Sequence, residues 1–225
     1  MDAREKFKEL VKALAPLLKG YGYKRQGQTF RVRRDDNWGV VFFRPEKWST
    51  KTELQFTINL GIFSQAIDSF YRGSSFFIAW GKETPPTEPA CQWRSKLDFL
   101  LFPERLGKPI WGINDSTELP DLIEELKAAL PLGVAEIEKY LKDEDLRDYF
   151  LTGKCGGYVD QHRLNCLAVL VTEYGPSEKL PAIFAELRAL STYKIYEDVR
   201  QEIESNIERL KQIAEAKNLQ ADSAE

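Results

Sequence analysis

Two stretches decide the fold of this chain: residues 29–44, which read TFRVRRDDNWGVVFFR, and residues 53–63, which read ELQFTINLGIF. Both are rich in β-branched and aromatic residues, and Asp-Asp-Asn at 35–37 places turn-forming residues between two runs of strand formers. This order predicts a strand, a three-residue turn and a second strand, then a third strand whose apolar residues alternate with polar ones. The sequence therefore predicts an antiparallel sheet.

Helical patterns flank the predicted sheet. Residues 4–19 carry apolar side chains at spacings of three and four and are followed by Gly20, which is typical of an amphipathic helix and its end. Further helices, the last with a break near 190–193, are predicted over residues 117–130, 132–151, 160–174 and 177–218. Weaker patterns indicate three more elements, namely a short helix or turn at 69–73 and strands at 75–80 and within 91–102.

The sequence thus predicts an α+β fold in two parts. The first part, residues 1–115, is an N-terminal helix packed on the antiparallel sheet. The second part, residues 116–225, is a helical C-terminal region packed on the first. A chain of 225 residues is long enough to bury a sizeable core without disulfides.

Composition and charge restrict the classes of function. The net charge is −3, so the whole molecule does not attract polyanions, and nucleic acid could bind only to a local cationic patch. The three cysteines are widely spaced and the N-terminus lacks the apolar segment of a signal peptide, which predicts a cytoplasmic protein. No run approaches the roughly 18 apolar residues of a membrane-spanning helix, so no membrane partner is expected.

A local cationic patch lies in the predicted sheet. Its basic residues are Lys24, Arg25, Arg31, Arg33, Arg34 and Arg44. A three-residue turn would pair Arg34 with Trp38 and would place two arginines and two apolar residues on one face, namely Arg31, Arg33, Val41 and Phe43. The other face would then carry Phe30, Val32, Val40 and Phe42. The predicted binding residues are therefore Lys24, Arg25, Arg31, Arg33, Val41, Phe43 and Arg44.

Arginine beside apolar groups on a sheet is suited to contacts with an acidic protein, with phosphates or with stacked bases. Because the protein is acidic as a whole, the sequence favours an acidic protein partner over nucleic acid. The simpler alternative is that the arginine stems cover an ordinary sheet face while their charged ends stay hydrated.

Cys155, His162 and Cys166 are the soft metal ligands that lie closest together in the sequence. Three ligands leave a structural zinc site one short, and no cysteine pair has the two-residue spacing of such sites. The sequence therefore predicts no metal and no cofactor. It places Cys166 in the core and His162 on the surface.

Cys155 is also the candidate nucleophile, because it lies in a Gly-rich segment just before a predicted helix with Asp160 as its N-cap. A helix N-terminus and the nearby Lys154 would lower the pKa of the thiol. Since no orienting partner for His162 and no oxyanion donor can be identified, the sequence predicts no catalytic residue. An enzyme with a composite site, built on Cys155 or on the sheet arginines, remains the alternative.

The last predicted helix carries an apolar stripe at spacings of three and four, made of Ile195, Val199, Ile203, Ile207, Leu210 and Ile213 or Ala214. Such a stripe usually packs on the same molecule, and a dimer contact is the alternative. The oligomeric state is left open.

Aromatic and glycine motifs follow one another in a fixed order: GYGYKRQGQTF at 20–30, WGVVFF at 38–43, FTINLGI at 56–62, WRSKL at 93–97 and WGI at 111–113. In this order the chain resembles the bacterial domain-of-unknown-function family 4304 over roughly residues 5–150. The resemblance implies an α+β fold and a bacterial source, and it transfers no reaction. Together with the cationic patch it predicts a non-catalytic bacterial protein-binding module in a toxin-neutralising or phage-defence setting.

Overall fold

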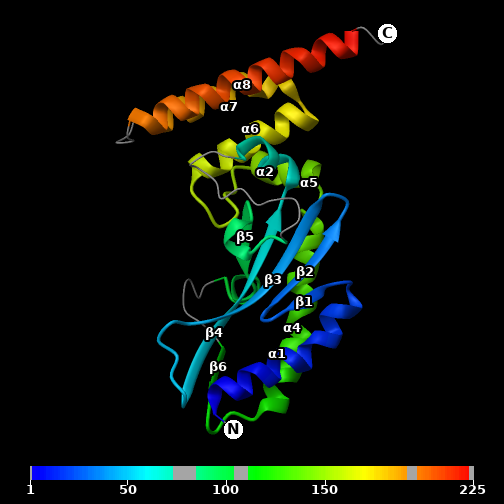
Figure 1. The fold of residues 1–225 in the computed structure, drawn as a ribbon, viewed down its shortest axis with the longest axis vertical. Helices are drawn as coiled ribbons and strands as arrows, with labels where there is room; N and C mark the ends of the chain where they lie inside the picture. The colour runs from blue at the N-terminus through cyan, green and yellow to red at the C-terminus, as the bar shows by residue number, and fades with distance from the viewer. Residues whose placement is uncertain (1, 73–84, 104–110, 192–196, 223–225) are drawn as a thin grey trace.

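The computed structural model describes residues 2–72, 85–103, 111–191 and 197–222, and it has the predicted α+β fold (Figure 1). Helix α1, Ala3–Gly20, opens the chain. Its N-terminus is closed by a capping box, in which the Asp2 carboxylate accepts from the backbone amide of Glu5 and the Glu5 carboxylate accepts from that of Asp2. The buried side of α1 is the predicted apolar stripe, and it packs against the sheet.

The sheet has six antiparallel strands within the described residues. They are β1 Lys24–Gln26, β2 Thr29–Arg34, β3 Asn37–Pro45, β4 Glu53–Phe63, β5 Trp93–Lys96 and β6 Trp111–Asn114. The first five pair in sequence order, and β6 pairs with the first half of β4, on residues that β5 leaves unpaired. Strand β1 is therefore a three-residue edge, and β4 is the central long strand.

The turn between β2 and β3 differs from its prediction. Arg34 pairs with Asn37, so the turn has two residues, and Asp35 adopts φ 50°. Aspartate is one of the few residues other than glycine that tolerates this left-handed backbone. The pairing places Phe30 opposite Val41 and Arg31 opposite Val40, one residue away from the predicted register.

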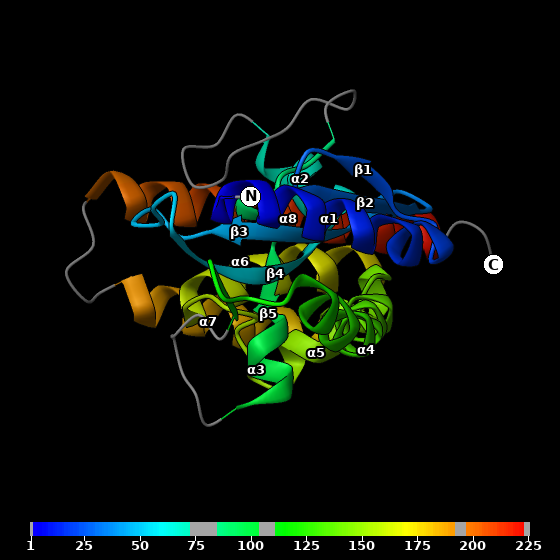
Figure 2. The ribbon, with the colours of Figure 1, turned by 90° about the horizontal axis from the view of Figure 1, so that it is seen from below.

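One side of the sheet, the core face, is covered by α1 and by α4, Leu119–Lys139. Figure 2 shows α3, α4 and α5 together on one side of strands β3 and β4. Gly39 permits the close approach of α4, because a Cβ atom there would lie 2.7 Å from Cγ2 of Ile137. The predicted helix break at Pro131 is wrong: α4 continues through it, because Leu130 and Val134 on either side are both buried.

Short elements occupy the middle of the chain. They are α2 Gln65–Tyr71, the 3₁₀ helix η1 Glu88–Ala90 and α3 Leu97–Leu101. The strand predicted within 91–102 is half right, because β5 ends at Lys96 and a helix follows directly. The short helix predicted at 69–73 begins earlier, and the strand predicted at 75–80 lies outside the described residues.

The remaining helices form a layer beyond one end of the sheet (Figure 1). They are α5 Asp143–Leu151, α6 Asp160–Tyr174, the 3₁₀ helix η2 Ser177–Lys179, α7 Leu180–Ser191 and α8 Glu197–Asp222. Helix α6 is its centre, since every residue from Arg163 to Thr172 is buried. The stripe on α8 packs inside this layer, with Ile203, Ile207 and Leu210 almost fully buried, while Ile195 lies outside the described residues.

None of the helices that the structure describes is both long and apolar enough to cross a lipid bilayer.

Candidate functional site

The second side of the sheet carries most of the predicted basic residues. The strand register pairs Arg31 with Val40 and Arg33 with Trp38, so cations and apolar side chains alternate on this side. We call it the cationic face, and its members on β1 to β5 are Lys24, Gln26, Thr29, Arg31, Arg33, Trp38, Val40, Phe42, Arg44, Glu53, Gln55, Thr57, Asn59, Gly61, Phe63, Arg94 and Lys96.

Val41 and Phe43 are not on this face. Both are 0% exposed and belong to the core, so the prediction that they share a surface with Arg31 and Arg33 is wrong. The reason is the two-residue turn, because a shift of one position moves every side chain of a strand to the other face. On β3, the apolar members of the cationic face are instead Trp38, Val40 and Phe42.

Arg31 is buried rather than open to a partner. Its Nε donates to the carbonyl of Pro86 at 2.5 Å, and its Nη1 donates to Oε1 of Gln26 at 3.0 Å. Burial lowers the pKa of this guanidinium. Arg31 therefore fastens the segment before η1 to the sheet.

The segment from Pro86 to Cys91, which contains η1, covers part of the cationic face. Cys91 lies directly on Gly61, where a Cβ atom would be 2.6 Å from the Cys91 sulfur. Val40, Phe63 and Cys91 form a small apolar cluster of their own at this point. Trp38 packs against this cluster and stays half-buried.

Three cations of the face are exposed: Lys24, Arg33 and Arg44. Arg33 stacks over the ring of Trp38 at 5.7 Å and pairs with Asp36 at 3.0 Å, with both charged side chains more than half exposed. Such an exposed pair contributes little to stability. Lys24 and Arg44 form no ion pair with any residue that the structure describes. Trp38 and Phe42 between them are half-buried.

Arg25 and Arg34 lie elsewhere. Arg25 lies opposite Phe30 in the pairing of β1 with β2, and its Cζ atom is 5.9 Å from the centre of the Phe30 ring. It therefore belongs to the core side of β1. Arg34 reaches α4, where it pairs with Glu138 at 3.3 Å and donates to the carbonyl of Tyr21. The predicted set of seven binding residues thus divides between two faces.

A pocket of about 450 Å³ lies beside β5, whose outer edge is hydrogen-bonded to the loop after α5 through the Arg94 amide and the Gly156 carbonyl. We call it the β5 pocket. Its aromatic lining comes from β5, α3, α4 and α5 and consists of Trp93, Phe99, Tyr140 and Tyr149. Its charged lining consists of Arg44, Arg94, Lys96, Lys154, Glu88 and Glu136. Arg44, Arg94 and Lys96 belong to the cationic face as well, so the two surfaces are continuous.

The rings of the β5 pocket form one cluster. The ring centroids of Tyr140 and Tyr149 are 4.6 Å apart, and Trp93 lies 6.0 Å from the first and 6.4 Å from the second. Burial raises the pKa of Tyr149, although the Trp93 indole and the backbone of Gly156 oppose this shift. The phenol is therefore neutral at physiological pH and is able to donate a hydrogen bond.

Two lysines of the pocket are held over aromatic rings rather than by carboxylates. The ammonium of Lys96 is 5.3 Å from the Phe99 ring, and that of Lys154 is 5.8 Å from the Tyr149 ring. Neither forms an ion pair within the described part of the chain. Arg94, in contrast, pairs with the buried Glu88 at 3.8 Å.

Cys155 does not have the environment of a reactive thiol. Helix α6 has the predicted range, Asp160–Tyr174, but its N-cap is Val159 instead of the predicted Asp160. The Cys155 sulfur lies 3.5 Å from Oδ1 of Asp160, and burial together with this carboxylate raises the pKa of the thiol. The lowered pKa that the composite-enzyme alternative needed is therefore absent at Cys155.

His162 is half-buried, so its predicted surface position is wrong, whereas Cys166 is buried as predicted. The imidazole stacks on Tyr158 with ring centroids 3.7 Å apart, and its Nε2 lies 3.1 Å from the carbonyl of Gln92. Burial lowers the pKa of His162 to about 4. In the described residues no group of three or more His, Cys, Asp or Glu side chains is placed to hold a metal ion.

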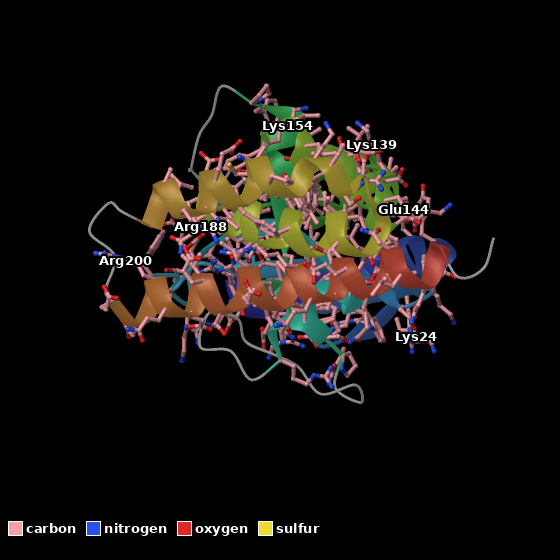
Figure 3. The ribbon with its side chains drawn as sticks, turned by 90° about the horizontal axis from the view of Figure 1, so that it is seen from above. Lys24, Lys139, Glu144, Lys154, Arg188 and Arg200 are labelled. Atoms are coloured by element: carbon pink, nitrogen blue, oxygen red, sulfur yellow. The ribbon has the colours of Figure 1, made fainter. Side chains whose placement is uncertain are left out.

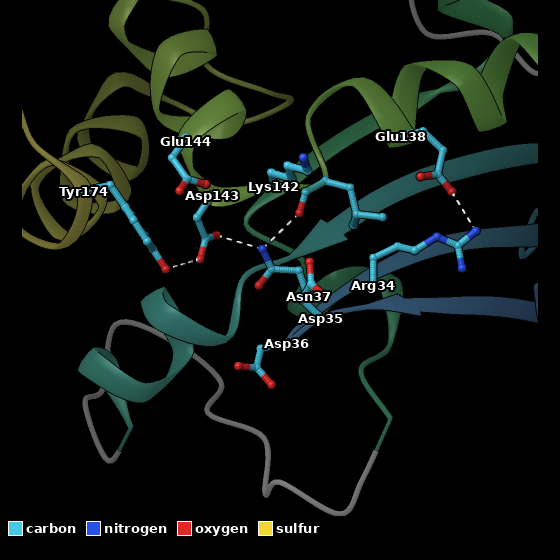
Figure 4. Close-up of a pocket in the computed structure, with 10 residues that line it drawn as sticks. Arg34, Asp35, Asp36, Asn37, Glu138, Lys142, Asp143, Glu144 and Tyr174 are labelled. Carbon is cyan, nitrogen blue, oxygen red and sulfur yellow. Dashed lines mark hydrogen bonds and ion pairs between the residues drawn. The ribbon is translucent and has the colours of Figure 1, made fainter.

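A second, acidic pocket of about 480 Å³ lies between the β2–β3 turn and the helices (Figure 4). At its centre the buried Asp143 accepts from Nδ2 of Asn37 at 2.9 Å and from the hydroxyl of Tyr174 at 3.0 Å. Burial raises the pKa of Asp143. Asn37 also donates to the carbonyl of Leu141, so this network joins the hairpin to α5 and α6. Its polar groups satisfy one another, which indicates a structural role.

The β5 pocket could not be found by spacing along the sequence. Tyr140 and Tyr149 fall inside one predicted helix, where nine residues correspond to about two and a half turns and would put them on opposite faces. The structure breaks that helix at residues 140–142, and the break brings the two rings together. The only signal in the sequence is a local excess of aromatic residues.

A family model described as a domain of unknown function, DUF4304, matches residues 14–137. The match runs from α1 through the sheet to the end of α4, so it includes the cationic face and leaves out α5 to α8. No curated protein and no solved structure matches the chain.

Proposed function

The chain belongs to the family of domains of unknown function DUF4304, and we propose from its surface that it is a non-catalytic binding module that captures an acidic protein on the cationic face. The observation that carries this proposal is the exposure of Lys24, Arg33 and Arg44 around the half-buried Trp38 and Phe42. Arginine and aromatic residues are enriched where proteins bind one another, and a rim of one charge sign speeds the encounter with a partner of the opposite sign.

The charge pattern of the face supports a protein partner. Among the strand-paired positions on this side of the sheet, Glu53 at the start of β4 is the one carboxylate. The whole molecule carries a net charge of −3, so the charge of this face is opposite in sign to that of the molecule as a whole. A partner with an acidic, partly apolar surface would complement both features.

The proposal includes a setting. We place the protein in the bacterial cytoplasm, in toxin neutralisation or phage defence, where a small binding module acts by covering the surface of another protein. The support for this setting is the accessory character of the bacterial family that the chain resembles. The raised pKa of the Cys155 thiol supports the absence of a catalytic role.

The test is charge reversal on the accessible part of the face. A partner is first sought among the products of neighbouring genes by co-purification, and its affinity is then measured by isothermal titration calorimetry. We expect Lys24→Glu with Arg33→Glu to weaken binding by at least about tenfold, because each change replaces an attraction with a repulsion. Arg31 is left unchanged, since its burial makes a stability loss unavoidable.

The matched control is Lys139→Glu with Lys142→Glu, which makes the same change in net charge at two exposed residues away from this face. The midpoint temperature of thermal unfolding of both double variants should stay close to that of the unchanged protein. A partner that binds the Lys24/Arg33 variant as tightly as the control would refute the proposal. Selective binding of single-stranded nucleic acid, with an affinity that falls steeply as the salt concentration rises, would also refute the proposal.

A further inference from the structure

We propose that the β5 pocket is a small-molecule site for a planar aromatic ring that carries a phosphate, with the size and chemistry of a nucleoside monophosphate. This inference goes beyond the proposed function, because it concerns a concave site with a ligand of its own rather than the protein-binding surface. Its volume of about 450 Å³ lies within the range of small-molecule sites, about 300–1,000 Å³.

The aromatic lining provides the platform for a ring. Phe99 and Tyr149 are half-buried, so part of each ring remains accessible, while Trp93 and Tyr140 behind them are almost fully buried. Tyr140 and Tyr149 come from different helices and Trp93 from the sheet, and their contacts hold one another in place. Because the cluster is already ordered, stacking a base on it costs little conformational entropy of the protein, which favours binding.

The cations provide the site for the phosphate. Arg44, Lys96 and Lys154 surround the pocket and form no ion pair with the residues described. They come from three separate segments, β3, β5 and the loop after α5, and therefore converge only in the folded protein. A guanidinium with two ammonium groups is the donor set that phosphate oxygens prefer.

The polar groups between ring and phosphate favour a nucleotide over a simple aromatic acid. The neutral hydroxyl of Tyr149 and the carboxylate of Glu136 lie in the same pocket as the cations. A hydroxyl and a carboxylate suit the ribose hydroxyls and the exocyclic amines of a base. Glu136 forms no ion pair with any described residue and repels a phosphate placed near it, so it also limits the affinity for bare phosphate.

The two surfaces can be tested separately. Figure 3 shows Lys154, which belongs to the β5 pocket alone, and Lys24, which belongs to the cationic face alone, on opposite sides of the molecule. Arg44, Asn59, Arg94 and Lys96 belong to both, so they are not used as test positions.

The experiment is isothermal titration calorimetry of the full chain with AMP, GMP, CMP and UMP, and with adenosine, guanosine and inorganic phosphate as probes of the two halves. We expect at least one monophosphate to bind with a dissociation constant below about 1 mM and at least about tenfold more tightly than phosphate or its own nucleoside. Lys154→Ala should weaken that binding by about tenfold, because one charge-assisted contact is lost. Glu136→Gln should strengthen the binding of inorganic phosphate, because a repulsion is removed.

The control is Lys142→Ala, which removes an exposed lysine from the acidic pocket and should leave the affinity unchanged. Tyr149→Leu should also weaken binding, and its thermal unfolding shows whether the cluster survives the change. The proposal is overturned if none of the monophosphates binds, if phosphate alone binds as tightly as a nucleotide, or if Lys154→Ala binds as the Lys142→Ala control does. Loss of protein binding in the Lys24/Arg33 variant with intact nucleotide binding would show the two sites to be independent.

Discussion

Asp98 is a carboxylate whose burial lowers the stability of the folded protein when the side chain is charged. It lies at the start of α3 with 1% of its surface exposed, and neither carboxylate oxygen has a hydrogen-bond partner among the residues that the structure describes. Burial raises its pKa, and only its own backbone and Lys96 oppose this shift. Because the folded protein holds this proton more tightly than the unfolded chain, the side chain favours folding below its unfolded pKa of about 3.9. That contribution is lost as the pH rises through the folded pKa.

Asp98→Asn should therefore stabilise the protein near neutral pH, by about 1 kcal/mol, since an unpaired buried charge becomes a neutral amide. The gain should shrink toward about pH 4, because the raised pKa lets the folded aspartate take up its proton at a higher pH than the unfolded chain does. Urea denaturation at the two pH values measures both effects. Asp115→Asn, at an exposed position, is the control and should change neither. An equal or lower stability of Asp98→Asn at neutral pH would contradict this account.

At the residue scale the sequence predicted that basic side chains lie on the sheet, but it did not predict their surroundings. Arg33 and Arg44 are exposed on the sheet as predicted, whereas Arg31 is held under the segment before η1 by the carbonyl of Pro86. The two belong to segments 55 residues apart. No local pattern around Arg31 encodes such a contact, because it depends on where a distant loop returns to the sheet.

The contact between η1 and the sheet is the element-scale feature most open to test. Gly61→Ala would place a methyl group 2.6 Å from the Cys91 sulfur and should destabilise the protein by about 1–3 kcal/mol. Cys91→Ala in the same chain should recover part of this loss, because the sulfur is removed. Chemical denaturation of the single and double variants gives the interaction energy.

Gly112→Ala is the matched control, since it lies in β6 at the same edge of β4 and its nearest neighbour would be 3.9 Å away. It should change stability by much less than Gly61→Ala. Equal effects of the two substitutions would mean that Cys91 does not rest on Gly61.

The elements themselves were predicted well where one pattern dominates. The strand over 53–63 was predicted with the bounds that it has, because its strict alternation leaves one solution. The β2–β3 hairpin failed in register, since Asp-Asp-Asn fits turns of two or three residues equally well and the choice depends on which side chains the core accepts. Pro131 misled the prediction of α4 because burial of its neighbours outweighs the lost hydrogen bond.

At the scale of the whole molecule, one hydrophobic core joins the two predicted parts. It extends without interruption from Ala3 in α1 to Leu210 in α8 and includes both sides of the predicted boundary at 115. If residues 1–115 and residues 116–225 unfolded as separate units, a substitution in one part would leave the unfolding transition of the other part in place.

Ile207→Ala should destabilise the protein by about 3 kcal/mol, because it empties a site in α8 that is 1% exposed. All five tryptophans lie between residues 38 and 111 and none lies in α8, so tryptophan fluorescence reports on the first part and on its contacts with α4 and α5. If the core unfolds as one unit, the fluorescence transition in urea should shift together with the far-ultraviolet dichroism of the helices. A fluorescence transition that stays in place would show that the helical layer unfolds by itself.

The three-residue edge strand β1 also determines how this protein behaves when it is crowded. An open strand edge invites a second copy to extend the sheet, and such growth leads to fibrils. Here the edge is too short to offer more than a few hydrogen bonds, and Lys24 and Arg25 would bring like charges together across the seam. Of these two cations, Lys24 also belongs to the cationic face, so a residue proposed to bind an acidic partner also protects the sheet from self-propagation.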